Sequence, residues 1–258
     1  MTRPPLVFIP GLQGRWEYMR RAVDALASVG RVVTFSLDDV DAGRRFNADR
    51  GLDGYVEHIE HLLDARQIDR AVICGVSFGG IVALHFAAHR PNRTSALILV
   101  STPGPHWRLT PSRRILARFA WIGAPVFFAG MPWRLHEELR CAMPDLRERA
   151  ALIWEQARTL AHAPVSPARM AARARLIDAT GALSACGRVT APTLIITGEP
   201  SLDRIVPVND VDGVGGTLEY GRRIPGARIM QLDRTGHLGC ITRPREFAAA
   251  IGTFLDAA

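Results

Sequence analysis

The sequence contains no lysine, so all of its 32 basic residues are arginine, and with 25 acidic residues the formal net charge is +7. A basic balance is one property of nucleic-acid-binding proteins. Here the arginines are spread along the chain and alternate with acidic residues, as in Asp145–Arg149, which is typical of a solvated surface. We therefore attribute the charge to compositional bias and expect no nucleic-acid partner.

Cysteine is also scarce, with four residues at Cys74, Cys141, Cys186 and Cys240. No two of them are spaced as in a C-x-x-C redox or zinc motif. Cys74 and Cys240 have apolar or glycine-rich neighbours, which is typical of small buried side chains. The pattern predicts reduced thiols, and we expect neither a metal nor an organic cofactor.

Long hydrophobic segments are absent. Apolar runs such as Leu6–Ile9 and Leu97–Val100 have the length of a buried strand, whereas a membrane-spanning helix needs about 20 residues. Met1–Pro5 is followed by only four apolar residues, too few for the core of a signal peptide. We expect a cytoplasmic protein without a membrane span, and the sequence does not indicate its oligomeric state.

The chain does have enough apolar residues, 48% of its 258 positions, to form one sizeable core. Short apolar runs alternate with segments of helical periodicity, which predicts a parallel sheet covered by helices on both faces. The expected strands are Leu6–Ile9, Val32–Phe35, Ala71–Cys74, Ala96–Val100, Thr193–Thr197 and Ala227–Leu232. The expected helices are Tyr18–Ala27, Asp53–Ala65, Gly79–Ala88 and Phe247–Leu255.

One long interval breaks this alternation. Between Gly104 and Gly187 the sequence is rich in arginine, alanine and aromatic residues, is punctuated by proline, and contains no convincing strand. We interpret it as several short helices inserted after the fourth strand. The predicted division is a core of residues 1–103 and 188–258, with a helical cap at residues 104–187.

The segment Gly75-Val76-Ser77-Phe78-Gly79 matches the G-x-S-x-G motif, directly after an expected strand and before an expected helix. Such a tight turn crowds the backbone, so its flanking positions need glycine. The serine is then exposed at the carboxyl edge of the sheet, and the helix N-terminus faces any oxyanion that develops there. The alternative is an ordinary tight turn, but the context favours Ser77 as a nucleophile.

A serine nucleophile needs a base, and His237 is the favoured candidate among eight histidines. It lies between two glycines just after the last expected strand, at the same sheet edge as Ser77. His85 and His89 are four residues apart on a helix and could instead bind a metal, but the pattern offers no third ligand. The histidines of the inserted segment, one of which could contact substrate, are His106, His136 and His162.

The third group must be a carboxylate that orients His237. The loop after the fifth expected strand contains Glu199 and Asp203, and Asp233 precedes His237 closely. We favour Asp203, since Glu199 suits the surface and Asp233 would often point away. The resulting chain order of serine, aspartate and histidine is one of the known orders of a catalytic triad.

These motifs resemble those of the α/β-hydrolase superfamily over nearly the whole chain. The resemblance implies a three-layer α/β sandwich with a mainly parallel sheet. It also implies that the backbone N–H groups of Leu12 and Phe78 form an oxyanion hole. Pro10 departs from the family pattern, in which histidine is usual, so the loop of Leu12 must be held in another way.

A second departure concerns the beginning of the sheet. Many members of the superfamily have an antiparallel hairpin there, which this chain is expected to lack. We therefore predict about six strands, all parallel, with Val32–Phe35 at an exposed edge.

Aromatic residues crowd the predicted cap and indicate a hydrophobic substrate pocket, although each could simply pack the cap onto the sheet. We expect hydrolysis of a small-to-medium hydrophobic carboxylic ester through an acyl-enzyme. The alternatives are carbon–carbon or thioester hydrolysis, acyl transfer, or a slow-turnover ligand receptor, because the fold does not decide among them. The expected pocket residues are Trp16, Phe119, Trp121, Phe127, Phe128, Trp133 and Leu238.

Overall fold

The protein is described by a computed structural model that places residues 3–42, 50–179, 182–210 and 215–257. Its centre is a six-stranded sheet in which every neighbouring pair of strands is parallel, in the order β2-β1-β3-β4-β5-β6. Within these residues the sheet has no antiparallel strand, and β2 lies at one edge, as predicted. The strands are β1 (Leu6–Ile9), β2 (Val32–Thr34), β3 (Ala71–Val76), β4 (Thr94–Val100), β5 (Thr193–Thr197) and β6 (Arg228–Gln231).

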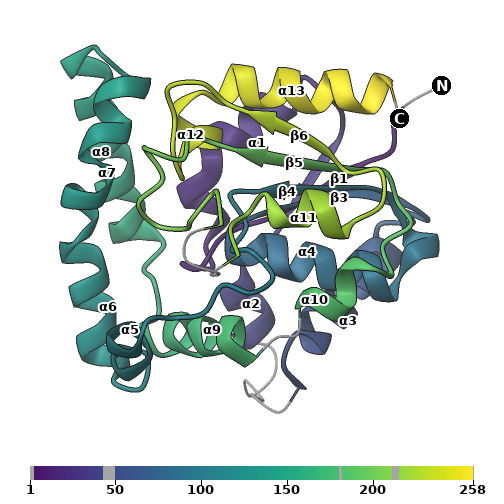
Figure 1. The fold of residues 1–258 in the computed structure, drawn as a ribbon, viewed down its shortest axis with the longest axis horizontal. Helices are drawn as coiled ribbons and strands as arrows, with labels where there is room; N and C mark the ends of the chain where they lie inside the picture. Colours follow the sequence, from purple (N-terminus) through teal and green to yellow (C-terminus); the bar gives the residue numbers. More distant parts are fainter. Residues whose placement is uncertain (1–2, 43–49, 180–181, 211–214, 258) are drawn as a thin grey trace.

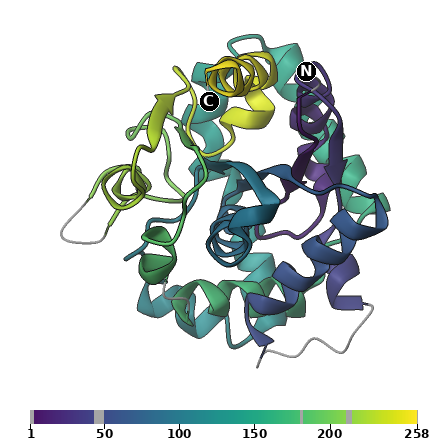
Figure 2. The same cartoon turned by 90° about the vertical axis from the view of Figure 1, so that its right-hand side faces the viewer.

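Helices cover both faces of this sheet and complete the three layers (Figures 1 and 2). One face carries α1 (Arg20–Leu26), which follows a 3₁₀ turn at Trp16–Met19, together with α12 (Gly239–Thr242) and α13 (Pro244–Asp256). The opposite face carries α2 (Leu37–Ala42), α3 (Asp53–Ala65), α4 (Phe78–His89), α10 (Ala182–Cys186) and α11 (Glu219–Arg223).

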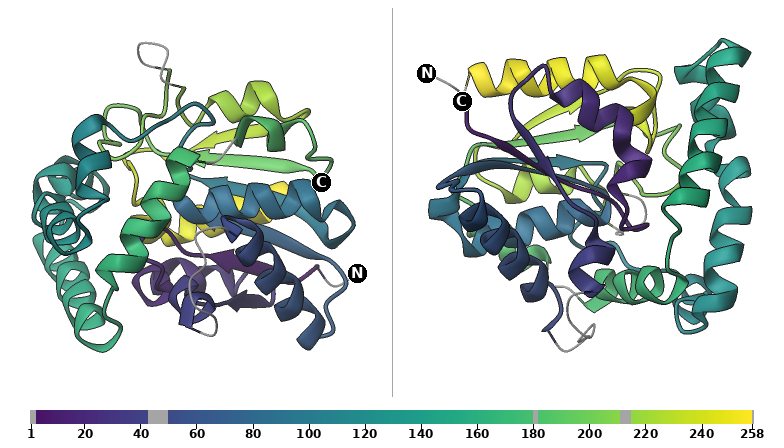
Figure 3. Two further views of the ribbon diagram at one scale, coloured as in Figure 1. Left: turned by 90° about the horizontal axis from the view of Figure 1, so that it is seen from below. Right: turned by 180° about the vertical axis from the view of Figure 1, so that it is seen from behind.

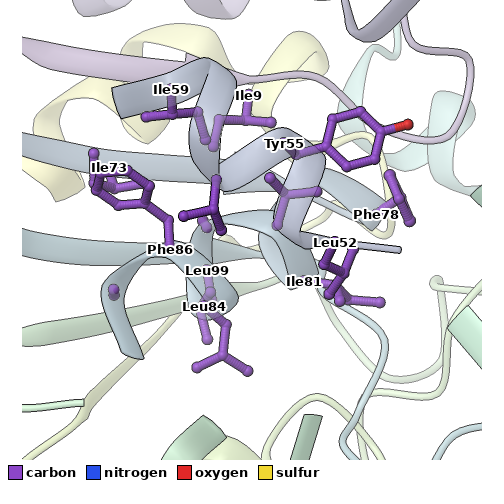
Figure 4. Close-up of a cluster of buried hydrophobic side chains, with 14 of the residues drawn as sticks. Ile9, Leu52, Tyr55, Ile59, Ile73, Phe78, Ile81, Leu84, Phe86 and Leu99 are labelled. Atoms are coloured by element: carbon purple, nitrogen blue, oxygen red, sulfur yellow. The ribbon is translucent and has the colours of Figure 1, made fainter. Parts of the chain in front are cut away.

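The hydrophobic core is divided by the sheet into two clusters. All six residues of β3 are buried, and because successive side chains of a strand point to opposite faces, Ile73 and Cys74 belong to different clusters. Figure 4 shows the cluster beneath α3 and α4, where Ile73 lies among Ile59, Phe86 and Leu99. This double burial explains why the strands are continuous apolar runs in the sequence.

The inserted segment forms a group of helices at one end of the sheet (Figure 3). One difference from the prediction is that these helices are not all short, since the longest of them has 17 residues. Another is that α10 packs against α4 of the core, inside the range predicted for the cap. No described helix is long and apolar enough to cross a membrane. The helices that we group as the cap are α5 (Pro111–Leu116), α6 (Ala120–Ala129), α7 (Met131–Ala142), α8 (Leu146–His162) and α9 (Pro167–Ala179).

Candidate active site

Ser77 occupies the sharp turn between β3 and α4, with a φ of +53° and a ψ of −118°. Such a backbone conformation is strained for a residue with a side chain and clusters at functional sites. The flanking glycines are required by space. A Cβ on Gly75 would lie 2.1 Å from the carbonyl oxygen of Gly79, and a Cβ on Gly79 would lie 2.4 Å from that of Ile9. The turn is therefore the strand–serine–helix elbow that the sequence predicts.

His237 is buried, with 7% of its surface exposed, and its Nδ1 lies 3.1 Å from Oδ2 of Asp203. The other carboxylate oxygen of Asp203 accepts the backbone N–H groups of Ile205 (3.0 Å) and Val206 (2.9 Å). These two bonds fix the carboxylate, which in turn orients the imidazole. Burial lowers the pKa of His237, but the charge of Asp203, its hydrogen bond and the charge of Glu138 together raise it above its usual value.

The two other candidate carboxylates have different partners. Glu199 accepts the backbone N–H of Arg234 at 2.6 Å and donates its own N–H to the carbonyl of Thr235 at 2.7 Å. Glu199 thus ties the loop after β5 to the loop that carries His237. Asp233 accepts a bond of 3.4 Å from the side-chain amide of Gln231. Of the three, Asp203 is the residue that the structure brings to His237.

The loop after β1 lies against the elbow, since a Cβ on Gly11 would lie 3.5 Å from the Cβ of Ser77. Leu12 and Ser77 line the same cavity. Phe78 is the first residue of α4, so its N–H has no carbonyl one turn earlier to bind. This arrangement fits Leu12 and Phe78 as the two donors of an oxyanion hole, a role that we propose for them below.

Arg173 of α9 accounts for how this loop is held without a histidine at Pro10. Its guanidinium donates from Nε to the carbonyl of Leu12 at 3.0 Å, from one terminal nitrogen to the carbonyl of Gln13 at 3.1 Å, and from the other to Asp38 at 2.8 Å. The side chain has no exposed surface, so these bonds form away from solvent. The sequence gives no local signal for these contacts, because Arg173 is between 135 and 161 positions away from its three partners.

Replacing Arg173 with methionine should therefore lower kcat on an ester substrate by roughly 10²-fold, the scale reported for losing one oxyanion donor. KM should change much less, because the loop acts mainly in the transition state. Steady-state kinetics on the variant, with the exposed Arg175→Met of the same helix as control, measure this effect.

The variant also leaves Asp38 buried without its partner, so a urea titration should accompany the kinetics to measure any loss of stability. The double variant Arg173→Met/Asp38→Asn removes the unpaired charge as well, and so separates this loss of stability from the loss of support for the loop of Leu12. Unchanged kcat in a folded Arg173 variant would contradict the role.

Glu138 of α7 is a functional candidate that the sequence did not reveal. It is fully buried, and its Oε1 accepts the backbone N–H of Leu238 at 2.7 Å. Its Oε2 is buried without a hydrogen-bond partner. Burial raises its pKa to about 7, while the polar backbone of Gly236, the charge of His237 and the hydrogen bond from Leu238 act in the opposite direction. The inserted segment thus places a buried carboxyl group on the backbone of the loop that carries His237, where its charge acts on the imidazole.

We expect Glu138→Gln to move the acidic limb of the pH profile of kcat/KM to lower pH. A negative charge on Glu138 raises the pKa of His237, so removing it should lower that pKa, and the imidazole should remain neutral, as a base must be, at more acidic pH. Glutamine still offers an oxygen to the N–H of Leu238, which limits the structural change. The profile should be measured beside Glu137→Gln, an exposed neighbour, and a shift to higher pH would contradict the coupling.

A cavity of about 500 Å³ extends from Ser77 and His237 into the cap. Its lining is mainly apolar and comes from the loop of Leu12, the loop of His237 and helices α5–α9. Among the predicted pocket residues, Phe127, Phe128 and Leu238 line it, as does the neighbouring Met131.

The structure does not place four other predicted pocket residues there. Trp121 and Trp133 are 79% and 80% exposed, and Phe119 is 58% exposed. Trp16 lies on the 3₁₀ turn, where the guanidinium of Arg20 is 5.3 Å from the centre of its ring. The prediction was wrong for these residues. For Trp121 the reason is that α6 is apolar around its whole circumference, so the sequence does not indicate which of its sides faces the cavity.

The remaining histidines and cysteines have other surroundings. His85 bonds to Asp53 at 2.8 Å, and His106 bonds to Glu219. Of the histidines, only His237 is among the cavity-lining residues of the described chain. Within the same described ranges no three His, Cys, Asp or Glu side chains are placed to hold a metal ion. The four cysteines, all of which lie in the described residues, form no disulfide with one another, and three of them are buried.

Comparison with known proteins agrees with the fold. The family model described as "Alpha/beta hydrolase family" matches residues 6–250. A 2-hydroxymuconate semialdehyde hydrolase of Pseudomonas sp. (strain CF600) is 27% identical, over 97% of this chain and 86% of that protein. A pimeloyl-acyl-carrier-protein methyl ester esterase of Nitrosomonas europaea is 25% identical, over 83% of each chain. The structure of the enol-lactonase from Burkholderia xenovorans LB400 shares the fold, with a TM-score of 0.73 and 20% identity over 99% of this chain and 92% of that one.

Proposed function

Because this chain belongs to the alpha/beta hydrolase family, we propose that it is a serine hydrolase that cleaves a hydrophobic, small-to-medium carboxylic ester. The observation that carries the proposal is the buried Asp203–His237 pair, whose His237 lines one cavity together with the strained Ser77. A serine in an ordinary tight turn would need neither an oriented histidine nor a cavity.

In the proposed reaction, His237 Nε2 takes the proton of Ser77 as its Oγ attacks the ester carbonyl. Asp203 holds the proton on Nδ1 and stabilises the imidazolium that forms. The backbone N–H groups of Leu12 and Phe78 bind the oxyanion of the tetrahedral intermediate. The imidazolium then protonates the departing alkoxide, which leaves an acyl group on Ser77. A water molecule, deprotonated by His237, attacks this acyl group. The bond between the acyl carbon and Oγ of Ser77 then breaks, Oγ takes the proton back from the imidazolium, and the acid is released.

The character of the cavity supports an apolar acyl or aromatic group. Side chains such as Phe127, Leu135 and Leu139 line its cap side, and Leu238 lines it beside the imidazole. The same triad serves thioester and carbon–carbon hydrolysis, acyl transfer and slow-turnover ligand binding. Turnover of p-nitrophenyl butyrate at a steady rate distinguishes an esterase from a receptor, which would release at most one equivalent of product.

A chain-length series tests the substrate class. The value of kcat/KM for p-nitrophenyl esters should rise from acetate to about butyrate or hexanoate, because each buried methylene contributes about 0.8 kcal/mol, roughly a fourfold gain. The control is Trp133→Ala, which changes an exposed aromatic side chain outside the cavity and should leave the series unchanged. A flat profile, or a preference for acetate alone, would show that the cavity does not bind the acyl chain.

A further inference from the structure

Two cationic side chains interrupt the apolar lining of the cavity. Arg113 comes from α5 and Arg134 from α7, and both line the cavity that Ser77 and His237 also line. Both residues are half-buried. The guanidinium carbon of Arg134 lies 5.9 Å from the ring centre of Phe127, itself a lining residue. Burial, and then the charge of Arg134, lowers the pKa of Arg113 below its usual value, as expected for two cations that influence each other away from bulk water.

Neither guanidinium has a hydrogen bond or an ion pair with any residue that the structure describes. The other cap arginines that are buried or half-buried each have an acceptor, which makes this pair unusual. Removing charge from water without a counter-charge is unfavourable, so the pair is suited to an anion that arrives with the ligand. The contrasting arginines are Arg149, which donates to the carbonyl of Met143, Arg169, which donates to that of Asp38, and Arg173, which pairs with the carboxylate of Asp38.

We propose that Arg113 and Arg134 form a subsite for a carboxylate of the substrate, so that the preferred ester is an apolar chain that carries an anionic group. The proposal rests on the ester-hydrolase function above and specifies its substrate class. Arginine suits this role because its planar guanidinium binds a carboxylate through two parallel hydrogen bonds. The apolar lining would pack against the chain between the ester and the carboxylate.

Paired substrates test the subsite. In the first series, the p-nitrophenyl half-esters of dicarboxylic acids, from glutarate to suberate, carry the anion on the acyl side. Each is compared with the neutral p-nitrophenyl ester of equal chain length. Esters of 4-hydroxybenzoate, compared with phenyl esters, place the anion on the alcohol side. In one of the two series kcat/KM should be higher for the anionic substrate, and the anionic-to-neutral ratio should fall tenfold or more in Arg113→Gln/Arg134→Gln, mainly through KM.

Two variants serve as controls, one for the loss of positive charge and one for nonspecific effects of replacing an arginine in this region. Arg113→Lys/Arg134→Lys keeps both charges and should restore part of the ratio. Arg114→Gln removes the neighbouring arginine of the same helix, which pairs with Asp178 at 2.7 Å and is 51% exposed. This variant should keep the wild-type ratio. A preference for the neutral substrate at every length in both series, or an unchanged ratio in the double glutamine variant, would overturn the proposal.

A binding measurement separates this inference from the function on which it rests. Calorimetric titration of the Ser77→Ala protein with hexanoate and with hexanol requires no turnover. We expect the Ser77→Ala protein to bind hexanoate more tightly than hexanol. This difference in affinity should be lost when Arg113→Gln and Arg134→Gln are added to Ser77→Ala. Hydrolysis of neutral esters with equal binding of the two ligands would refute the subsite alone. Selective hexanoate binding by a protein that hydrolyses no ester would refute the esterase function alone.

Discussion

Substituting Ser77 with alanine is expected to reduce ester turnover by roughly 10⁴-fold or more, by analogy with deletions in other triads. The alanine removes the oxygen that forms the acyl-enzyme, while the oxyanion donors and the cavity remain and account for residual activity. His237→Ala should have an effect of the same size, because the hydroxyl of Ser77 is a weak nucleophile unless a base takes its proton. Steady-state turnover of p-nitrophenyl butyrate measures both losses.

The double variant Ser77→Ala/His237→Ala gives a sharper form of this result. Because the two residues act as one unit, the double variant should be about as slow as either single variant. A serine-reactive phosphonate should label the wild-type protein and fail to label Ser77→Ala, and thermal unfolding should show that each variant is folded. Labelling of the alanine variant, or activity within tenfold of wild type, would show that the nucleophile is a different residue.

Asp203→Asn is expected to cost about 10³- to 10⁴-fold in kcat, close to the loss seen when the aspartate of another triad is changed in this way. Asparagine can still accept the N–H groups of Ile205 and Val206 through its oxygen. Its amide nitrogen would then face Nδ1 of His237 and donate to it, which favours the tautomer with the proton on Nε2. That tautomer presents a proton instead of a lone pair to Ser77 and cannot act as its base.

Glu199→Gln is the matched control for this prediction. Its carboxylate lies on the same loop after β5 as Asp203 and accepts the N–H of Arg234, a bond that the glutamine oxygen can preserve. We expect this variant to retain most of the wild-type kcat. Full activity in Asp203→Asn together with a large loss in Glu199→Gln would show that Glu199 is the acid of the triad.

Much of the fold could be predicted because its signals are local. The apolar run Leu6–Ile9 and the segment Thr193–Thr197 are strands with the predicted bounds, and Asp53–Ala65 is a helix with the predicted bounds. In contrast, α2, α11 and α12 have six residues or fewer. Helices this short have little intrinsic stability and depend on tertiary packing, so their sequences carry no clear periodicity.

The sequence by itself determined the alternating α/β order and the elbow at Ser77, because side-chain periodicity and the steric need for glycine act between neighbouring residues. The sequence favoured Asp203 over Glu199, and the tertiary structure placed its carboxylate against His237. Tertiary structure alone placed Arg173 on the carbonyls of Leu12 and Gln13, and brought Glu138 to the loop of His237. It also decided which side of the apolar helix α6 faces the cavity. These outcomes depend on how distant segments pack, because a buried charge or an apolar face is stabilised by whichever partner the fold brings to it.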